Sequence, residues 1–151
     1  MGRLILISGA NGSGKSRFAE QLVSQTRGKR YYIATMAPQT EENHRRIQKH
    51  RQQRHGLGFQ TLELPCRIGD APISPAAVVL LEDVSNLMAN AFFGSSATAG
   101  QVLDDICTLL DRCHLLVAVT ISGLSPDGYT GDTAAYITAL NDLNARLLSR
   151  A

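Results

Sequence analysis

The chain has 151 residues, a length that suits one domain with a sizeable buried core. Its hydrophobic content of 44% is that of a globular protein, no apolar run approaches a membrane span of roughly 20 residues, and a net charge of +2 gives no indication of a nucleic-acid partner. No signal-peptide layout is visible, so a cytoplasmic setting is expected. Three cysteines without a C-x-x-C spacing predict free thiols (Cys66, Cys107 and Cys113).

The first part of the chain combines a strand, a glycine-rich loop and a helix. Residues 3–8 are an apolar, branched run that predicts a buried strand. The pattern G-x-x-x-x-G-K-S, the P-loop, follows at Gly9, Ala10, Asn11, Gly12, Ser13, Gly14, Lys15 and Ser16. Its backbone N–H groups surround phosphates, Lys15 reaches the β/γ-phosphates, and the Ser16 hydroxyl can hold Mg²⁺. Apolar residues at helical spacing then predict a helix from Lys15 or Ser16, with its N-terminus at the phosphates.

The rest of the chain alternates between predicted strands and helices. Strands are expected over residues 30–36, 59–64, 77–81 and 114–120. Pro38 ends the strand over residues 30–36, and the strand over residues 59–64 is expected at an edge of the sheet. Helices are expected over residues 41–55, 87–92, 102–110 and 136–147, with loops at residues 65–75, 94–100 and 122–131. This order predicts an α/β fold, a P-loop NTPase-type three-layer sandwich with a mostly parallel sheet, in which residues 1–151 form a single nucleotide-binding domain.

Two carboxylates stand where the apolar strand over residues 77–81 ends. Glu82 and Asp83 are therefore candidates for orienting Mg²⁺, directly or through a water molecule. Asp83 also precedes a helical pattern, and aspartate is a good N-cap residue, so a purely structural role stays open for it.

The predicted helix over residues 41–55 is polar and basic. Arg46, His50 and Arg54 are spaced i, i+4 and i+8, so they share one face. Two guanidinium groups beside an imidazole suit a phosphorylated ligand, with His50 as nucleophile or acid/base. We expect the arginines to lower the pKa of His50 by like charge. The alternative is a solvated charged face, and His44, Lys49 and His55 are interpreted as surface residues.

These motifs together resemble one family, the bifunctional adenosylcobinamide kinase/adenosylcobinamide-phosphate guanylyltransferases of cobalamin biosynthesis. The resemblance runs over nearly the whole chain. It is carried by Gly14-Lys15-Ser16-Arg17 with Ala19-Glu20, Tyr32-Ile33-Ala34-Thr35, Arg46-Ile47 with His50 and Arg54, Leu80-Leu81-Glu82 with Asn90, and Leu143-Asn144. The P-loop is shared by many families, whereas the combination is much more specific.

The resemblance implies a P-loop kinase-type fold assembled as a homo-oligomer, often a trimer. It implies phosphorylation of the corrinoid adenosylcobinamide by GTP or ATP with Mg²⁺, then transfer of GMP through a guanylylated histidine. At the matching positions His50 is the nucleophile with Arg46 and Arg54 flanking it, and Lys15, Ser16 and Glu82 serve phosphate and Mg²⁺. Arg17 and Thr35 lie in matching segments, and we expect them at the nucleotide and the substrate respectively.

The chain departs from the family pattern in three places. Ile121-Ser122-Gly123 follows Thr120 where members carry Asn-Glu-Val, Gly12 stands where many have Arg, and members continue past the last helix into a further strand. We therefore expect self-association of this chain through an uncovered sheet edge or apolar face. Two alternatives stay open, a degenerate nucleotide-binding protein with reduced or no turnover and a different small-molecule kinase.

Overall fold

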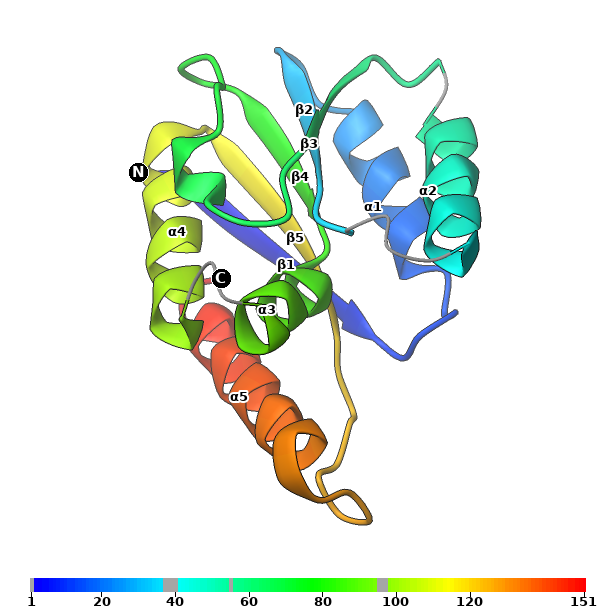
Figure 1. The fold of residues 1–151 in the computed structure, drawn as a ribbon. Helices are drawn as coiled ribbons and strands as arrows, with labels where there is room; N and C mark the ends of the chain where they lie inside the picture. Colours follow the sequence, from blue (N-terminus) through cyan, green and yellow to red (C-terminus); the bar gives the residue numbers. More distant parts are fainter. Residues whose placement is uncertain (1, 37–40, 55, 95–97) are drawn as a thin grey trace.

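The protein is built on a parallel sheet, seen in a computed structural model that describes residues 2–36, 41–54, 56–94 and 98–151 (Figure 1). Within these residues the strands form a five-stranded sheet in the order β1-β5-β4-β2-β3, and every neighbouring pair is parallel. The strands are β1 (Arg3–Gly9), β2 (Arg30–Ala34), β3 (Phe59–Glu63), β4 (Val78–Glu82) and β5 (Leu115–Ile121). The predicted α/β fold of the P-loop NTPase type is confirmed.

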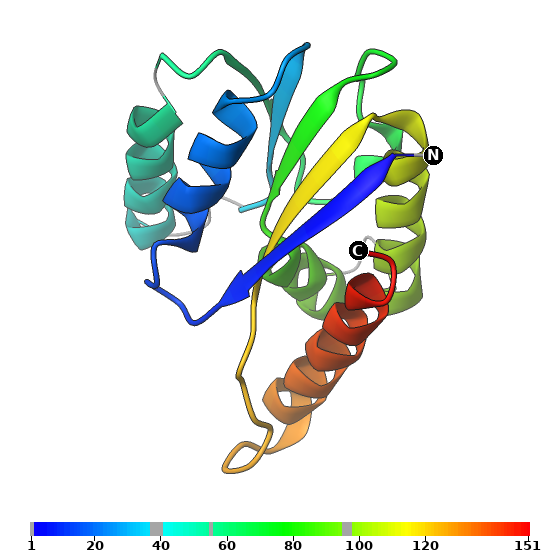
Figure 2. The ribbon, with the colours of Figure 1, turned by 180° about the vertical axis from the view of Figure 1, so that it is seen from behind.

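Helices cover both faces of the sheet and complete the three layers. They are α1 (Lys15–Ser24), α2 (Glu41–Arg54), α3 (Val84–Phe93), α4 (Ala99–Arg112) and α5 (Gly131–Leu148). Figure 1 and the reverse view in Figure 2 place α1 and α2 on one face and α3, α4 and α5 on the other. Among the described residues, no helix has the length and apolar character needed to cross a bilayer.

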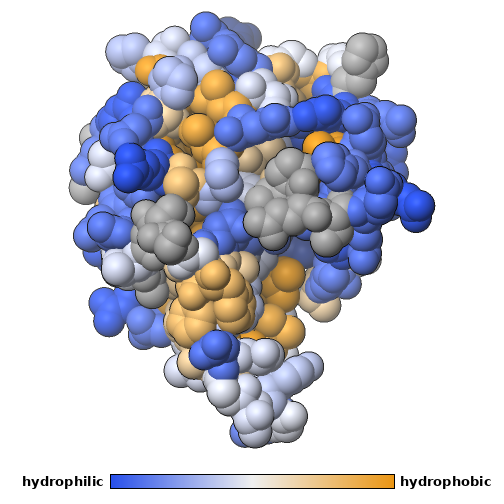
Figure 3. Space-filling model, viewed as in Figure 1, coloured by the Kyte–Doolittle hydropathy of each residue, from blue (hydrophilic) through white to orange (hydrophobic). Residues whose placement is uncertain are grey.

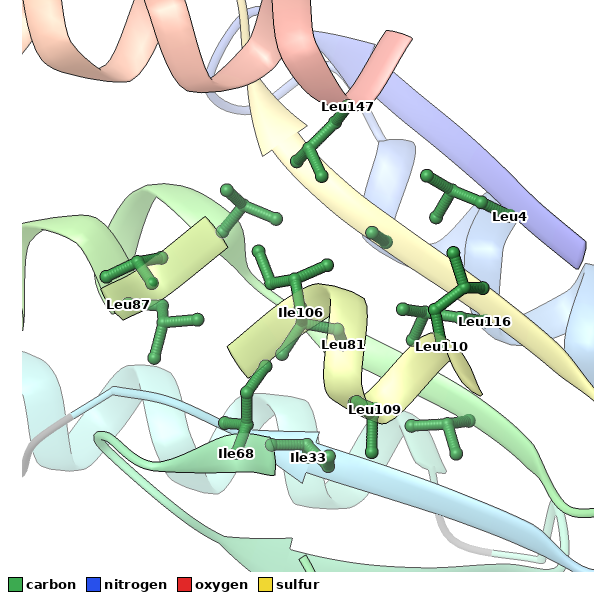
Figure 4. Packing of buried hydrophobic residues seen from close by; sticks show 14 of the residues in the cluster. Leu4, Ile33, Ile68, Leu81, Leu87, Ile106, Leu109, Leu110, Leu116 and Leu147 are labelled. Atoms are coloured by element: carbon green, nitrogen blue, oxygen red, sulfur yellow. The ribbon is translucent and has the colours of Figure 1, made fainter. Parts of the chain in front are cut away.

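The continuous apolar run of β4 is explained by burial on both faces. Val78 and Leu80 pack in the smaller cluster with residues of α1, whereas Val79 and Leu81 join the larger cluster with α3, α4 and α5. Figure 4 shows the larger cluster, where Leu81 lies among leucine and isoleucine side chains of the helices. A strand covered on both faces needs apolar residues at every position, which is typical of parallel sheets.

The observed elements differ from the predicted ones mainly at their ends. The predicted loop over residues 94–100 is wrong at its end, because α4 begins at Ala99 behind a capping box formed by Thr98 and Gln101. The predicted loop over residues 65–75 contains a short 3-10 turn, η1 (Ile68–Asp70). The three cysteines carry free thiols, as predicted. Pro38 and His55 lie outside the described residues.

The carboxyl ends of the strands meet at one edge of the sheet. Ala34 of β2 pairs with Glu82 of β4, and Glu82 pairs with Val119 of β5. Gly9, the last residue of β1, pairs with Ile121 of β5. The P-loop and the segments that follow β2, β4 and β5 therefore begin at the same edge, where ligands of open parallel sheets bind.

Candidate active site

The P-loop has the backbone conformation that its glycines permit. Gly12 and Gly14 have φ angles of 77° and 85°, in the left-handed region that favours glycine. Gly14 is the N-cap of α1, and the first turn of this helix holds no acidic residue. The N-terminus of α1 therefore carries free N–H groups and the positive end of the helix dipole, and no acidic side chain of its first turn offsets this charge. Such a helix end suits a phosphate. The Lys15 ammonium donates a hydrogen bond to the Ala10 carbonyl at 3.3 Å, so it lies over the loop.

The side chains of Ser16, on α1, and His50, on α2, face each other. The Oγ atom of Ser16 and the Nδ1 atom of His50 lie 3.4 Å apart, although 34 positions separate them in the chain. His50 is half-buried between the two helices. The structure thus brings the predicted nucleophile to the first turn of the P-loop helix.

The surroundings of His50 lower the pKa of its imidazole below the ordinary value. Burial is the largest cause, and the positive charges of Arg54, Lys49 and Arg46 add to it, while the Asp83 carboxylate acts in the opposite sense. The direction agrees with the expectation from the sequence. The expected contribution of the two arginines is confirmed, although burial is a larger cause than either of them and Lys49 contributes as well. A lowered pKa keeps the imidazole neutral near pH 7, the form that can act as a nucleophile.

Glu82 lies at the end of β4, on the Ser16 side of the site. Burial is the main reason that its pKa is raised to about 8, and the neighbouring carboxylates of Asp83 and Glu20 raise it further, whereas Ser16 and Lys15 lower it. Its Oε2 atom is buried and has no hydrogen-bond partner among the residues that the structure describes. A buried carboxylate oxygen without a partner beside a hydroxyl fits Mg²⁺, which takes oxygen ligands and commonly uses one or two protein groups together with phosphate oxygens.

Asp83 is the N-cap of α3. Its Oδ1 atom accepts hydrogen bonds from the Asn86 N–H and from the Ser85 hydroxyl, each at 2.7 Å. These two hydrogen bonds are the ones expected of an N-cap residue, the structural role that the sequence left open for Asp83.

Thr35 is buried behind the site. Its hydroxyl donates to the Glu82 and Asp83 carbonyls at 3.1 and 3.0 Å and accepts from the Asp83 N–H at 2.9 Å. The amide of Asn90 donates to the Thr35 carbonyl at 2.8 Å and to the Pro65 carbonyl at 2.9 Å. These bonds join the ends of β2 and β4, so the Thr35 hydroxyl is engaged within the protein. Its predicted contact with substrate stays a prediction.

The two arginines that flank His50 along α2 lie in different surroundings. Arg46 is exposed. Arg54 is only 7% exposed, and its guanidinium carbon lies 3.6 Å from the centre of the Tyr32 ring. The i, i+4, i+8 spacing indicates which residues share a face but not what that face meets. Sequence reasoning therefore missed Tyr32 and Glu20, whose only signal was their place in the family-like motifs.

Hollows lie along α2 on the site side. One of about 420 Å³ has Met36, Ile47 and Pro65 among its apolar walls, with His44 and Gln48 among its polar ones. A smaller neighbour shares Met36 and Ile47 with it and reaches His50 and Glu82. An apolar hollow of this size with a few polar groups is typical of sites for small organic ligands.

The end of β5 is hydrogen-bonded to α5. The buried Thr120 hydroxyl donates to Oδ1 of Asn144 at 2.7 Å, and Nδ2 of Asn144 donates to the Ile121 carbonyl at 3.0 Å. No carboxylate is present over residues 121–123. This segment therefore offers no acidic group to a ligand at the edge of the sheet.

Comparisons with known proteins agree with the motif analysis. The profile of the family described as "Cobinamide kinase / cobinamide phosphate guanyltransferase" matches residues 5–147. The "Bifunctional adenosylcobalamin biosynthesis protein CobU" of Escherichia coli (strain K12) is 37% identical to this chain over 92 residues. That match covers 60% of this chain and 50% of the relative, so it spans about half the length of the curated protein.

Proposed function

This chain belongs to the cobinamide kinase / cobinamide phosphate guanyltransferase family, and from that premise we propose that it phosphorylates adenosylcobinamide and then transfers GMP to the phosphate. One observation carries the transferase half of the proposal. The Nδ1 atom of His50 lies 3.4 Å from the hydroxyl of Ser16, the P-loop residue whose place is beside the phosphates.

In the proposed transfer, an imidazole nitrogen of His50 attacks the α-phosphorus of GTP. The N–P bond forms, the bond from the α-phosphorus to the bridging oxygen breaks, and pyrophosphate leaves. A phosphate oxygen of adenosylcobinamide phosphate then attacks the same phosphorus and releases the neutral imidazole. The lowered pKa of His50 supports this role, because a protonated ring has no free electron pair for the attack.

The remaining site residues bind and orient the triphosphate. The N–H groups of the P-loop and the Lys15 ammonium hold the phosphate oxygens, and exposed Arg46 is available to a further phosphate. Ser16 and Glu82 would hold Mg²⁺, which supplies charge neutralisation on the transferred phosphate when it is bound. In the kinase step, the oxygen of the substrate hydroxyl bonds to the γ-phosphorus and its proton is released to solvent. The bond from the γ-phosphorus to the β,γ-bridging oxygen breaks, and the nucleoside diphosphate leaves.

The test is formation of a covalent nucleotide on His50. We expect incubation with GTP and Mg²⁺ to yield a GMP adduct by intact-mass analysis, labile in acid and stable in base. His50→Ala should lose the adduct while retaining triphosphate binding at the P-loop. His114→Ala is the matched control, because His114 is exposed and precedes β5 at the opposite edge of the sheet. An adduct that survives His50→Ala would identify another nucleophile.

A second candidate function is nucleotide binding without turnover. It is favoured by Ile121-Ser122-Gly123, which places no amide or carboxylate where the family carries Asn-Glu. GTP binding at the P-loop without any adduct in the wild-type protein would favour this candidate over the transferase.

We also propose self-association, in line with the family resemblance. Phe93 at the end of α3 is 58% exposed and Leu148 at the end of α5 is 67% exposed. Figure 3 shows a hydrophobic area over the α3 region, whereas the surface over α2 is hydrophilic. A single monomeric species by light scattering at high protein concentration would contradict this proposal.

A further inference from the structure

Thr35 is a fully buried polar residue at the carboxyl edge of the sheet, directly after β2. Its hydroxyl accepts a hydrogen bond from the Asp83 N–H at 2.9 Å. The hydroxyl proton has two acceptors within reach, the Glu82 carbonyl at 3.1 Å and the Asp83 carbonyl at 3.0 Å. The N–H of Thr35 also donates to the Glu82 carbonyl, at 3.1 Å. Thr35 therefore holds the Glu82–Asp83 backbone with its main chain and its side chain.

The Glu82–Asp83 backbone is the joint between a strand and a helix. Glu82 is the last residue of β4 and α3 begins at Val84, so Asp83 alone connects the two elements. The strand ladder of β4 ends at Glu82, and beyond it the Thr35 hydroxyl serves as the acceptor for the Asp83 N–H. A backbone N–H that loses its acceptor away from water is costly, so this joint depends on the hydroxyl.

Asn90 holds Thr35 from the other side. It lies on α3, seven residues after Asp83, and its Nδ2 atom donates to the Thr35 carbonyl at 2.8 Å and to the Pro65 carbonyl at 2.9 Å. An amide nitrogen carries two hydrogens, so it can make both bonds at once. The contacts form a closed ring, because Asp83 begins α3, Asn90 of α3 binds Thr35, and Thr35 binds Asp83.

The side chain that extends from this joint is that of Glu82. It lines a small hollow together with His50 and Asn86. Its Oε2 atom is buried, and no described residue donates a hydrogen bond to it. Since no protein donor holds this oxygen, the direction of the carboxylate depends on the backbone from which it extends. The same oxygen is the one available to Mg²⁺ in the proposed site.

We propose that Thr35 and Asn90 form a clasp on the Glu82–Asp83 backbone, and that this clasp keeps the Glu82 carboxylate in the hollow that it shares with His50. The clasp consists of the hydrogen bonds of the Thr35 hydroxyl and of the Asn90 amide. Thr35 and Asn90 are thus positioning residues that act through Glu82. This role differs from a direct contact between Thr35 and a ligand, and the experiments separate the two.

The first experiment measures the joint without using the reaction. Thr35→Val keeps the shape of the side chain and removes the hydroxyl. We expect exchange of the Asp83 amide hydrogen, read by NMR, to become about tenfold faster, because it loses its acceptor, and to stay near the wild-type rate in Thr35→Ser. Thr138→Val is the matched control, since the exposed Thr138 hydroxyl donates to the Ala134 carbonyl of its own helix, α5. Unchanged exchange in folded Thr35→Val would overturn the clasp.

The second experiment tests whether Asn90 acts through Thr35. Asn90→Ala should also speed exchange of the Asp83 amide, and it should add nothing in Thr35→Val, because the hydroxyl that it positions is already absent. Asn141→Ala is the matched control, because the Asn141 amide of α5 also donates to a loop carbonyl, that of Leu124. Independent effects of the two substitutions would contradict the clasp. If Thr35→Val fails to fold, unchanged exchange in Asn90→Ala would overturn it.

The consequence for Mg²⁺ rests on the proposed function. The probe is a fluorescent GTP analogue with a methylene group between the α- and β-phosphorus atoms, which cannot transfer GMP. Thr35→Val should raise the Mg²⁺ concentration needed for half-maximal enhancement of binding about tenfold, and it should add no shift in Glu82→Gln. Affinity for the probe in EDTA should stay near the wild-type value, because the P-loop is untouched. A lower affinity in EDTA would indicate direct contact with the nucleotide and overturn the positioning role, as would an unchanged Mg²⁺ dependence.

Failure of the clasp and failure of the proposed function give different results. A wild-type protein that forms no GMP adduct would defeat the proposed transfer, yet the exchange and Mg²⁺ measurements do not use the reaction and would still decide the clasp. Normal adduct formation with unchanged Asp83 exchange in Thr35→Val would leave the function standing and overturn the clasp.

Discussion

Replacing Asp83 separates a structural role of this carboxylate from a role in metal binding. The Asp83 side chain accepts hydrogen bonds from the Asn86 N–H and the Ser85 hydroxyl. Loss of an N-cap side chain costs about 0.5–2 kcal/mol. The buried Ser85 hydroxyl would lose its acceptor as well, at a cost of about 1 kcal/mol. We therefore expect Asp83→Ala to lower the free energy of unfolding by about 1.5–3 kcal/mol.

Asp83→Asn should behave differently, because an amide oxygen caps a helix as well as a carboxylate does. We expect this variant to stay within about 0.5 kcal/mol of the wild type. It also removes a negative charge that helps to raise the pKa of Glu82, so relief of repulsion should offset part of any loss.

Urea denaturation of the wild type, Asp83→Asn and Asp83→Ala measures these differences, with exposed Asp104→Ala of α4 as the matched control. In thermal unfolding, a loss of about 1.5–3 kcal/mol corresponds to roughly 3–12 °C for a chain of this size. The capping argument would be refuted if Asn destabilised as much as Ala, or if Ala were neutral. A stable Asp83→Asn variant with weakened Mg²⁺-dependent GTP binding would instead assign Asp83 to the metal.

Three further predictions follow from the P-loop, the imidazole and the core. Lys15→Ala should abolish binding of a fluorescent GTP analogue in a folded protein, whereas Lys29→Ala should not, and unchanged affinity of the Lys15 variant would contradict the P-loop assignment. The ring of His50 should titrate with a midpoint below pH 6.5 by NMR, since burial and neighbouring cations lower its pKa, and a higher midpoint would show that it is exposed. Leu109→Ala should cost about 2–5 kcal/mol in chemical denaturation because Leu109 is fully buried, while exposed Leu148→Ala should cost little; equal losses would be inconsistent with the packing.

The sequence predicted the fold well because its signals were local. The apolar runs of β1, β4 and β5 and the glycine spacing of the P-loop are readable without knowledge of distant residues. The start of α4 was misplaced because small residues around Gly100 hid the capping box of Thr98 and Gln101, although that spacing is itself a sequence signal.

The site was predicted less completely because its contacts join distant parts of the chain. The shared face of Arg46, His50 and Arg54 follows from helical spacing alone. That Arg54 is buried against Tyr32 while Arg46 is exposed depends on how α2 lies over the sheet, and a hydrophilic helix gives no periodic signal for that. The burial of Glu20 was hidden for the same reason, since an acidic residue four positions after Ser16 is ordinarily solvated.

The strand order also has a consequence for the time course of folding. In the described sheet β1 pairs with β5 and no other strand, and Arg3 lies opposite Leu115. The strand that leads into the P-loop therefore finds its partner only after β5 has left the ribosome, and closing so long a loop is slow. We expect the nucleotide-binding loop to be among the last parts of the chain to become ordered during synthesis. Triphosphate bound there would then stabilise the finished sheet selectively, because it binds the native state and not the partly synthesised chain.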